Sequence, residues 1–94
     1  MTDYYHPIYP DALVIERKPR PEKRKRLRKL LLYYFGDKCL CCKARSIKLT
    51  LDHVLPRCLG GKAEPSNLQL LCYPCNHKKA DQIIDYRPYA LDFL

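Results

Sequence analysis

The chain has 94 residues, of which 18 are Lys or Arg and 10 are Asp or Glu, so its formal net charge is +8. A chain this short forms one small domain with a thin core, for which a metal or a disulfide is a natural supplement. It contains neither the ~20 consecutive apolar residues of a membrane span nor a basic start followed by a long apolar stretch. We therefore expect neither a membrane-spanning protein nor a secreted one. The basic charge suits a polyanionic partner such as nucleic acid, and the net charge alone would equally fit association with a membrane surface or the ribosome.

Composition divides the chain into two parts. Residues 1–20 are rich in Tyr and Pro and predict an extended arm, whereas residues 21–94 predict the folded domain. A basic run crosses this boundary, because residues 17–29 hold nine of the 18 Lys and Arg and a single acid, Glu22. Like charges this dense destabilise an isolated helix, so phosphate contacts would help to order the segment. The candidates for such contacts are Arg24, Lys25 and Arg28, and the alternative is a solvated helix face.

A helix is predicted over residues 21–35. Pro21 suits the first helical position, because the N–H that proline lacks would be unpaired there. Apolar residues then recur at helical spacing, and Gly36 suits the position after the last turn. The apolar residues of this face are Leu27, Leu30, Leu31 and Tyr34. The helix should therefore have a polybasic first half and an apolar second half that docks on the core.

Downstream of this helix the pattern predicts a strand, a loop, a second strand and a second helix. Ile47, Leu49 and Leu51 alternate with polar residues, which is typical of a short half-buried strand. This strand should deliver an Asp-His pair, Asp52 and His53, at its end. The later elements are predicted as a loop over residues 58–67 turned by Gly60 and Gly61, a strand over residues 68–71, a helix over residues 74–85 that begins at a proline, and an apolar tail that packs on the domain.

Four of the six cysteines form two pairs with the pattern C-x2-C-x29-C-x2-C. Zinc takes four tetrahedral ligands, and a C-x2-C turn places two sulfurs for one edge of that tetrahedron. The predicted ligands of this structural zinc are Cys39, Cys42, Cys72 and Cys75. The two remaining cysteines, Cys41 and Cys58, are interpreted as small packed side chains, with a redox or catalytic thiol as the alternative.

One segment follows the first C-x2-C pair and includes the second: DHVLPRCLGGKAEPSNLQLLCYPCNHKK. It resembles the HNH endonucleases of the subfamily braced by a four-cysteine zinc. The resemblance covers residues 37–82. It implies a small α+β fold, in which a ββα-metal (His-Me finger) unit is braced by the four-cysteine zinc knot and preceded by the basic helix. It also implies hydrolysis of DNA phosphodiester bonds with the help of one divalent cation.

The same resemblance implies roles for four residues. His53 corresponds to the general base that activates water, for which we expect an apparent pKa on the order of 6–7. Asp52 corresponds to a ligand of the catalytic cation, and Asn67 to an amide that bridges the loop and supports the histidine. Asn76 stands where many members have a second His, so the motif here reads H-N-N. An amide oxygen suits a hard cation, which favours Mg2+ or Mn2+.

Some alternatives stay open at the level of sequence. His77 could replace Asn76 at the cation, although it lies about 100° further round a helix. Arg57 and Lys79 are candidates for phosphate contacts or for ordinary solvated charges. The expected partner is DNA, contacted mostly through its backbone, in a bacterial or phage cytoplasm, and the oligomeric state is left open. The rival functions are a non-catalytic zinc-ribbon module that binds nucleic acid and an RNA-directed nuclease of the same fold.

Overall fold

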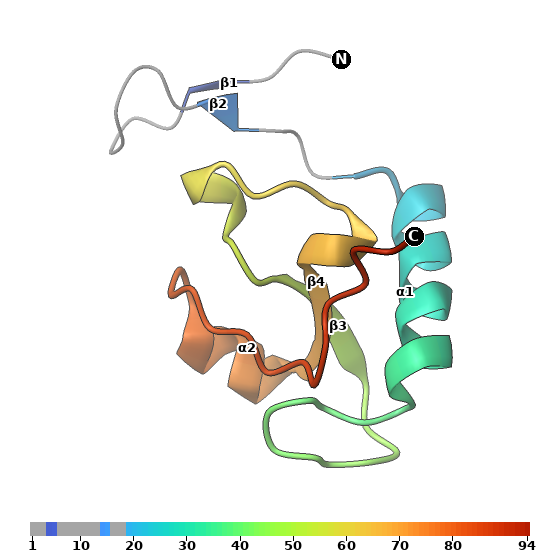
Figure 1. Ribbon diagram of the computed structural model, residues 1–94. Coiled ribbons are helices and arrows are strands. Elements are labelled where there is room, and N and C mark those ends of the chain that lie inside the picture. Colours follow the sequence, from blue (N-terminus) through green and yellow to red (C-terminus); the bar gives the residue numbers. More distant parts are fainter. Residues whose placement is uncertain (1–3, 6–13, 16–18) are drawn as a thin grey trace.

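The computed structural model describes residues 4–5, 14–15 and 19–94. The elements follow in the order β1 (Tyr4–Tyr5), β2 (Val14–Ile15), α1 (Pro21–Phe35), β3 (Leu49–His53), the 3-10 turns η1 (Arg57–Leu59) and η2 (Pro65–Asn67), β4 (Leu68–Cys72) and α2 (Tyr73–Lys79) (Figure 1). This is a small α+β arrangement, as predicted. Most of the predicted arm lies outside the described residues, within which β1 and β2 pair antiparallel, with Tyr4 opposite Ile15.

Helix α1 begins and ends where the sequence predicts. Proline occupies its first turn, and at its end the N–H of Gly36 donates to the Leu32 carbonyl at 2.9 Å. Gly36 has φ of +82°, a backbone conformation that a side chain disfavours. The buried stripe is Leu27, Leu31 and Phe35, spaced four residues apart. The other two predicted members of the face, at positions 30 and 34, are only partly buried and flank the stripe.

Strands β3 and β4 form a two-stranded antiparallel sheet in which Asp52 lies opposite Gln69 and His53 opposite Leu68. Such a pair is marginal alone and needs packing on its faces. All five residues of β4 are buried. Helix α1 lies to one side of the sheet and α2 to the other, while the tail runs along the sheet and ends beside α1 (Figure 1). The prediction that Ile47 belongs to the first strand is wrong. Ser46, with φ of +55°, turns the chain just before it and leaves Ile47 41% exposed.

The loop between the strands is held by a close backbone approach at Gly61. A Cβ atom at this position would lie 1.7 Å from the carbonyl oxygen of Leu55, so no other residue fits without moving the loop. Gly60, just before it, has φ of +93° and closes the η1 turn with its N–H on the carbonyl of Arg57. The two glycines are therefore required for different reasons. A side chain at Gly61 would collide with the backbone, and Gly60 has a backbone conformation that a side chain disfavours.

Helix α2 is shorter than predicted, because it ends at Lys79 and not near residue 85. Ala80 has φ of +48° and stops the helix, with its N–H bonded to the Asn76 carbonyl. Beyond it the chain runs extended beside β4, where the buried amide of Gln69 donates to the Ile84 carbonyl and accepts from the Tyr86 N–H, both at 2.9 Å. A helix over the same residues would lose both bonds to a fully buried side chain.

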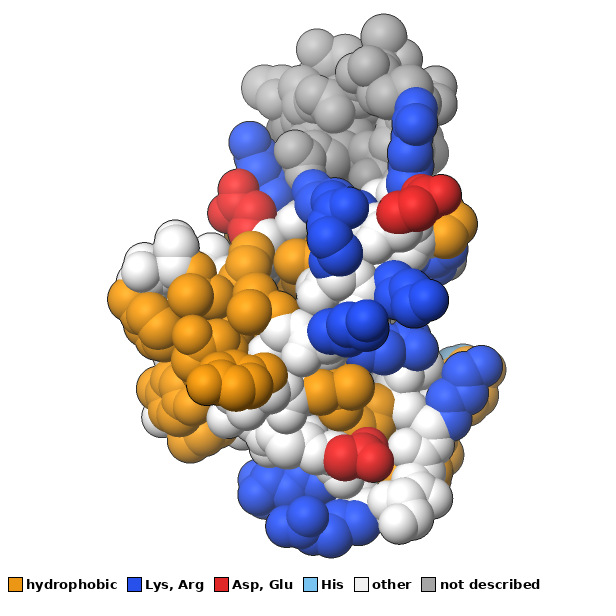
Figure 2. Space-filling model, turned by 90° about the vertical axis from the view of Figure 1, so that its right-hand side faces the viewer, with side chains coloured by type: hydrophobic (Ala, Val, Ile, Leu, Met, Phe, Trp, Pro, Cys, Tyr) orange, Lys and Arg blue, Asp and Glu red, His pale blue; other side chains and the backbone are white. Residues whose placement is uncertain are grey.

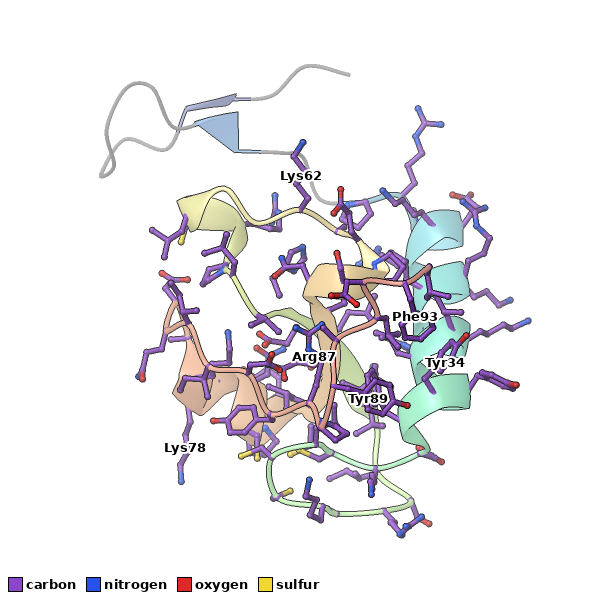
Figure 3. The ribbon with its side chains drawn as sticks, in the orientation of Figure 1. Tyr34, Lys62, Lys78, Arg87, Tyr89 and Phe93 are labelled. Atoms are coloured by element: carbon purple, nitrogen blue, oxygen red, sulfur yellow. The ribbon has the colours of Figure 1, made fainter. Side chains whose placement is uncertain are left out.

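The C-terminal tail packs back on the domain, as predicted. Leu91 is buried in the core, and the ring of Tyr89 lies 5.2 Å from that of Phe35. Phe93 contacts the ring of Tyr34 edge to face, so the tail reaches across to the second half of α1 (Figure 3). Arg87 joins the tail to η2 by donating to the Ser66 carbonyl at 2.8 Å. The tail therefore covers apolar surface that the small sheet leaves open.

Candidate functional site

The four predicted zinc ligands come together at one end of the sheet. Their sulfur atoms all lie within 4.8 Å of one another, although 29 residues separate the two C-x2-C pairs. A zinc ion with Zn–S bonds of ~2.3 Å requires sulfurs about 3.8 Å apart. The sulfurs of Cys42 and Cys72 lie at that separation, 3.8 Å. Donor chemistry and spacing therefore both fit a structural zinc that ties the segment after α1 to the junction of β4 and α2.

The local electrostatics of this knot favour a bound cation. Burial disfavours the thiolate of Cys39, but backbone N–H groups of the two knuckles, including that of Cys42 at 3.5 Å, lower its pKa to about 6. The pKa of Cys75 is raised, first because its thiol hydrogen-bonds with Cys72 and then by burial. Neighbouring thiolates repel one another, so a dication is what allows all four to ionise together.

A cleft of about 370 Å3 lies at the end of β3, and it collects the three residues predicted for chemistry. Asp52, His53 and Asn76 all line it, although neighbouring strand residues point to opposite faces of a sheet. The strand ends at His53 and the chain bends from Val54, which lets both side chains reach the same cleft. Arg57 and Cys58, from the η1 turn, also line this cleft.

The Asp52 carboxylate is buried and firmly oriented. Its Oδ2 atom accepts a hydrogen bond from Gln69 at 2.9 Å and forms an ion pair with Lys79 at 3.2 Å. Burial raises the pKa of Asp52, and the bonds from these two neighbours offset part of that rise. Among the described residues both contacts use Oδ2, so Oδ1 is the atom left for a further ligand.

Lys79 lies inside the domain, so both interpretations of it, as a phosphate contact and as a solvated surface charge, are wrong. Its side chain is fully enclosed, and its ammonium also donates to the His53 carbonyl at 2.9 Å. One buried cation thus bridges the two adjacent residues of the Asp-His pair. Removing it would leave the Asp52 carboxylate buried without its counter-ion, so Lys79 stabilises the site and does not reach outward.

The His53 imidazole is held in its neutral form. Burial lowers its pKa to about 4, with the charges of Arg57 and Lys79 adding to the effect. This value lies below the apparent pKa of about 6–7 expected from the sequence, because that expectation assumed an ordinary environment. Within the described part of the chain its Nε2 atom is enclosed and has no hydrogen-bond partner. The lowered pKa therefore favours the uncharged imidazole at neutral pH.

Asn67 bridges the loop, as the resemblance implies. Its Nδ2 atom donates to the carbonyls of Leu55 and Lys62, at 3.1 and 3.0 Å, and its Oδ1 atom accepts from the Leu55 N–H at 2.9 Å. Its own carbonyl accepts from the N–H of Val54, the residue after His53. One side chain thus holds both arms of the loop that follows the histidine.

The structure places Asn76 and His77 on different surfaces of the domain. Asn76 lies in the cleft, where its amide donates to the hydroxyl of Thr50 at 2.8 Å. His77 is exposed on the outer surface of α2, where its ring stacks on Tyr73 with centroids 5.7 Å apart. Lys78 also points away from the domain (Figure 3). A cation in the cleft would therefore meet the amide of Asn76.

A second cavity, of about 420 Å3, adjoins the first and runs between the sheet and α1. His53, Arg57 and Asn76 line both cavities. Four of the described residues that line this groove are cations and none is an acid; the cations are Arg24, Arg28, Lys48 and Arg57. Lys25 lies outside the lining. Figure 2 shows that Lys and Arg side chains follow the exposed surface of α1.

No sequence pattern predicted three of the residues at or behind the site. Lys48 looked like the polar side of an ordinary strand, and Thr50 carried no signal of its own. Gln69, by contrast, is a polar residue within an apolar run, and a polar side chain there must find partners when it is buried. That pattern could have identified Gln69 as a residue that orients something in the core.

A ββα domain with a four-cysteine cluster that fits a structural metal, and with an Asp-His pair at the end of its first strand, defines a nuclease-type scaffold. The HNH endonuclease family model matches residues 39–86, just over half of the chain. The chain belongs to the HNH endonuclease family. Comparison with curated proteins and with solved structures found no significant match. Among the described residues, no helix is long and apolar enough to cross a membrane.

Proposed function

We propose that this protein is an endonuclease that hydrolyses DNA phosphodiester bonds with one divalent cation. The single observation that carries the proposal is the shared cleft. A neutral imidazole, a carboxylate and a carboxamide line one cavity next to a cationic groove. Hydrolysis of a phosphodiester needs those parts: a base for the attacking water, ligands for a cation and positive charge around the phosphate.

In this mechanism His53 takes the proton of the attacking water. Its lowered pKa keeps it unprotonated near neutral pH, and the rigid loop held by Asn67 fixes the direction of attack. Arg57 lines both cavities together with the histidine, which supports a role for its guanidinium in neutralising a phosphate oxygen. Lys79 fixes the position of the Asp52 carboxylate relative to the backbone of His53 by binding both.

The donors in the cleft fit a hard divalent cation. Asp52 offers a carboxylate oxygen and Asn76 an amide oxygen, and such ligands suit Mg2+ or Mn2+. When bound, this cation would stabilise the charge that develops on the phosphate and its leaving oxygen. Gln69 and Lys79 orient the Asp52 carboxylate, which is the support that a metal-binding carboxylate needs.

The basic test of the proposal is cutting of supercoiled plasmid DNA. Zinc-loaded protein should nick or linearise the plasmid when Mg2+ or Mn2+ is added and leave it intact when neither is present. The comparison should omit the cation and not rely on a chelator, because a chelator could also strip the structural zinc and unfold the domain. If the protein binds DNA but does not cut it with either cation, the non-catalytic binding module becomes the better description. Cutting of RNA but not of DNA would select the RNA-directed nuclease.

The groove predicts which cations of α1 matter for DNA binding. Arg24 and Arg28 line the groove, whereas Lys25 and Lys29 lie on the same helix outside it. We expect Arg24→Gln/Arg28→Gln to weaken DNA binding through the loss of about two phosphate contacts. The slope of log K against log salt should then become less steep by roughly 1.8. Fluorescence anisotropy over a series of salt concentrations measures this.

The matched control is Lys25→Gln/Lys29→Gln, which removes the same charge from the same helix. Its salt slope should stay close to that of the wild type. If both double variants reduce the slope equally, the helix binds through its overall charge and the groove is not the path of the backbone.

A further inference from the structure

The Thr50 hydroxyl connects the sheet to the cleft through two hydrogen bonds. Its Oγ1 atom donates to the carbonyl of Leu71, its partner across the sheet, at 2.8 Å. The same oxygen lies 2.8 Å from Nδ2 of Asn76. Thr50 sits two residues before Asp52 on β3, and it lines the groove together with His53 and Asn76.

A hydroxyl has a single proton, and this decides which way the Asn76 amide faces. The Leu71 carbonyl can only accept, so the short contact with it requires the proton of Thr50. Toward Asn76 the hydroxyl can then only accept, and it must face the NH2 group of the amide. With the nitrogen turned to the strand, the Oδ1 atom is the end of the amide left for the cleft.

From this geometry we infer that Thr50 is a positioning residue that holds the Asn76 carboxamide with its oxygen toward the cation site. The inference rests on the proposed function, because the oxygen matters only where the cleft takes a cation. Without the hydroxyl the amide can turn over and present its NH2 group, which repels a cation. Partners that orient a metal ligand in this way affect metal affinity or activity by about 10–100-fold.

The test uses Thr50→Val, which keeps the shape and the strand propensity but has no hydroxyl, and Thr50→Ser, which keeps the hydroxyl. In zinc-loaded protein, a titration with Mn2+ followed by electron paramagnetic resonance gives the dissociation constant. We expect Thr50→Val to weaken Mn2+ binding about tenfold or more and Thr50→Ser to restore it. In DNA cleavage the same loss should appear mainly in the Mn2+ concentration needed for half-maximal rate, because saturating Mn2+ selects the productive amide orientation.

A second readout needs no manganese at all. In the zinc-loaded protein, the nuclear magnetic resonance signals of the Asn76 side-chain amide should differ from those of an exposed Asn. Thr50→Val should move them toward the exposed values, and Thr50→Ser should not. An Asn76→Asp background adds a further check, because a carboxylate has an oxygen at either end. In that background Thr50→Val should change Mn2+ affinity by less than about twofold.

Each other outcome overturns the inference. Equal Mn2+ affinity of Thr50→Val and wild type would show that the hydroxyl does not orient the ligand. A failure of Thr50→Ser to restore binding would assign the loss to packing and not to the hydrogen bond. If the wild type itself binds no Mn2+ while the amide signals behave as expected, the proposed function fails, and with it the role of Thr50 in orienting a cation ligand.

Discussion

His53→Ala is expected to abolish detectable cutting of plasmid DNA while the protein keeps its fold, its zinc and its affinity for DNA. Removal of a general base costs about 10²–10⁴-fold in rate. The side chain lies at the end of β3 and outside the zinc knot, and its Nε2 atom makes no hydrogen bond with any described residue. Its loss should therefore leave the structure in place. Single-turnover cleavage in Mn2+, with circular dichroism and zinc content as checks, measures the effect.

The chain offers a matched control for this substitution in His77. It is also a histidine, but it lies on the exposed surface of α2 and does not line the cleft. His77→Ala should cut DNA at close to the wild-type rate. If His77→Ala strongly reduced the rate of cutting and His53→Ala reduced it only mildly, the result would contradict His53 as the base and Asn76 as the cation ligand.

The lowered pKa of His53 predicts a flat dependence of kcat/KM on pH near neutrality. Burial and two neighbouring cations lower the pKa of His53 to about 4, so the neutral form dominates at higher pH. At pH 6 only about 1% of such an imidazole is protonated, whereas about three quarters of a histidine with an ordinary pKa of 6.5 would be. At saturating Mn2+, kcat/KM should therefore be nearly flat between about pH 6 and 8. A fall of about fourfold at pH 6 would show that the imidazole titrates as an exposed histidine does.

Cys72→Ser is expected to lose the zinc and, with it, the cooperative unfolding of the domain. Cys72 ends β4, immediately precedes α2 and is buried in the core, so its ligand bond joins two elements of a thin structure. Zinc binding in small zinc-finger peptides contributes ~10 kcal/mol or more, which exceeds the stability of most small domains. Zinc content by atomic absorption and thermal unfolding by circular dichroism measure the outcome.

Cys41→Ser is the matched control, since this thiol lies within the first knuckle but outside the cluster of four sulfurs. It should keep one zinc per chain and a cooperative transition, with at most a small loss of packing. If Cys72→Ser retained zinc, Cys41 would be serving as a replacement ligand. The variant lacking both thiols would then separate this case from a domain that folds without metal.

Features that depend on local chemistry could be predicted from the amino-acid sequence. The bounds of α1 follow from a proline at its start, a glycine after its end and apolar residues on one face between them. The zinc ligands follow from the spacing within each C-x2-C pair, because that short turn sets the separation of two sulfurs. The order of Asp52, His53, Asn67 and Asn76 along the chain indicated the family, because a motif is a pattern of residue types and spacings.

Features in which distant segments meet could not be predicted in this way and required the folded chain. Lys79 resembles any surface lysine of a helix in sequence, yet it is buried because Asp52, 27 positions earlier, pairs with it in the fold. The early end of α2 depends on Gln69, whose side-chain amide hydrogen-bonds to the backbone of the residues after that helix. The lowered pKa of His53 and the orientation of Asn76 depend on neighbours from other elements. Burial and hydrogen bonding across the fold set these properties, and no local pattern encodes them.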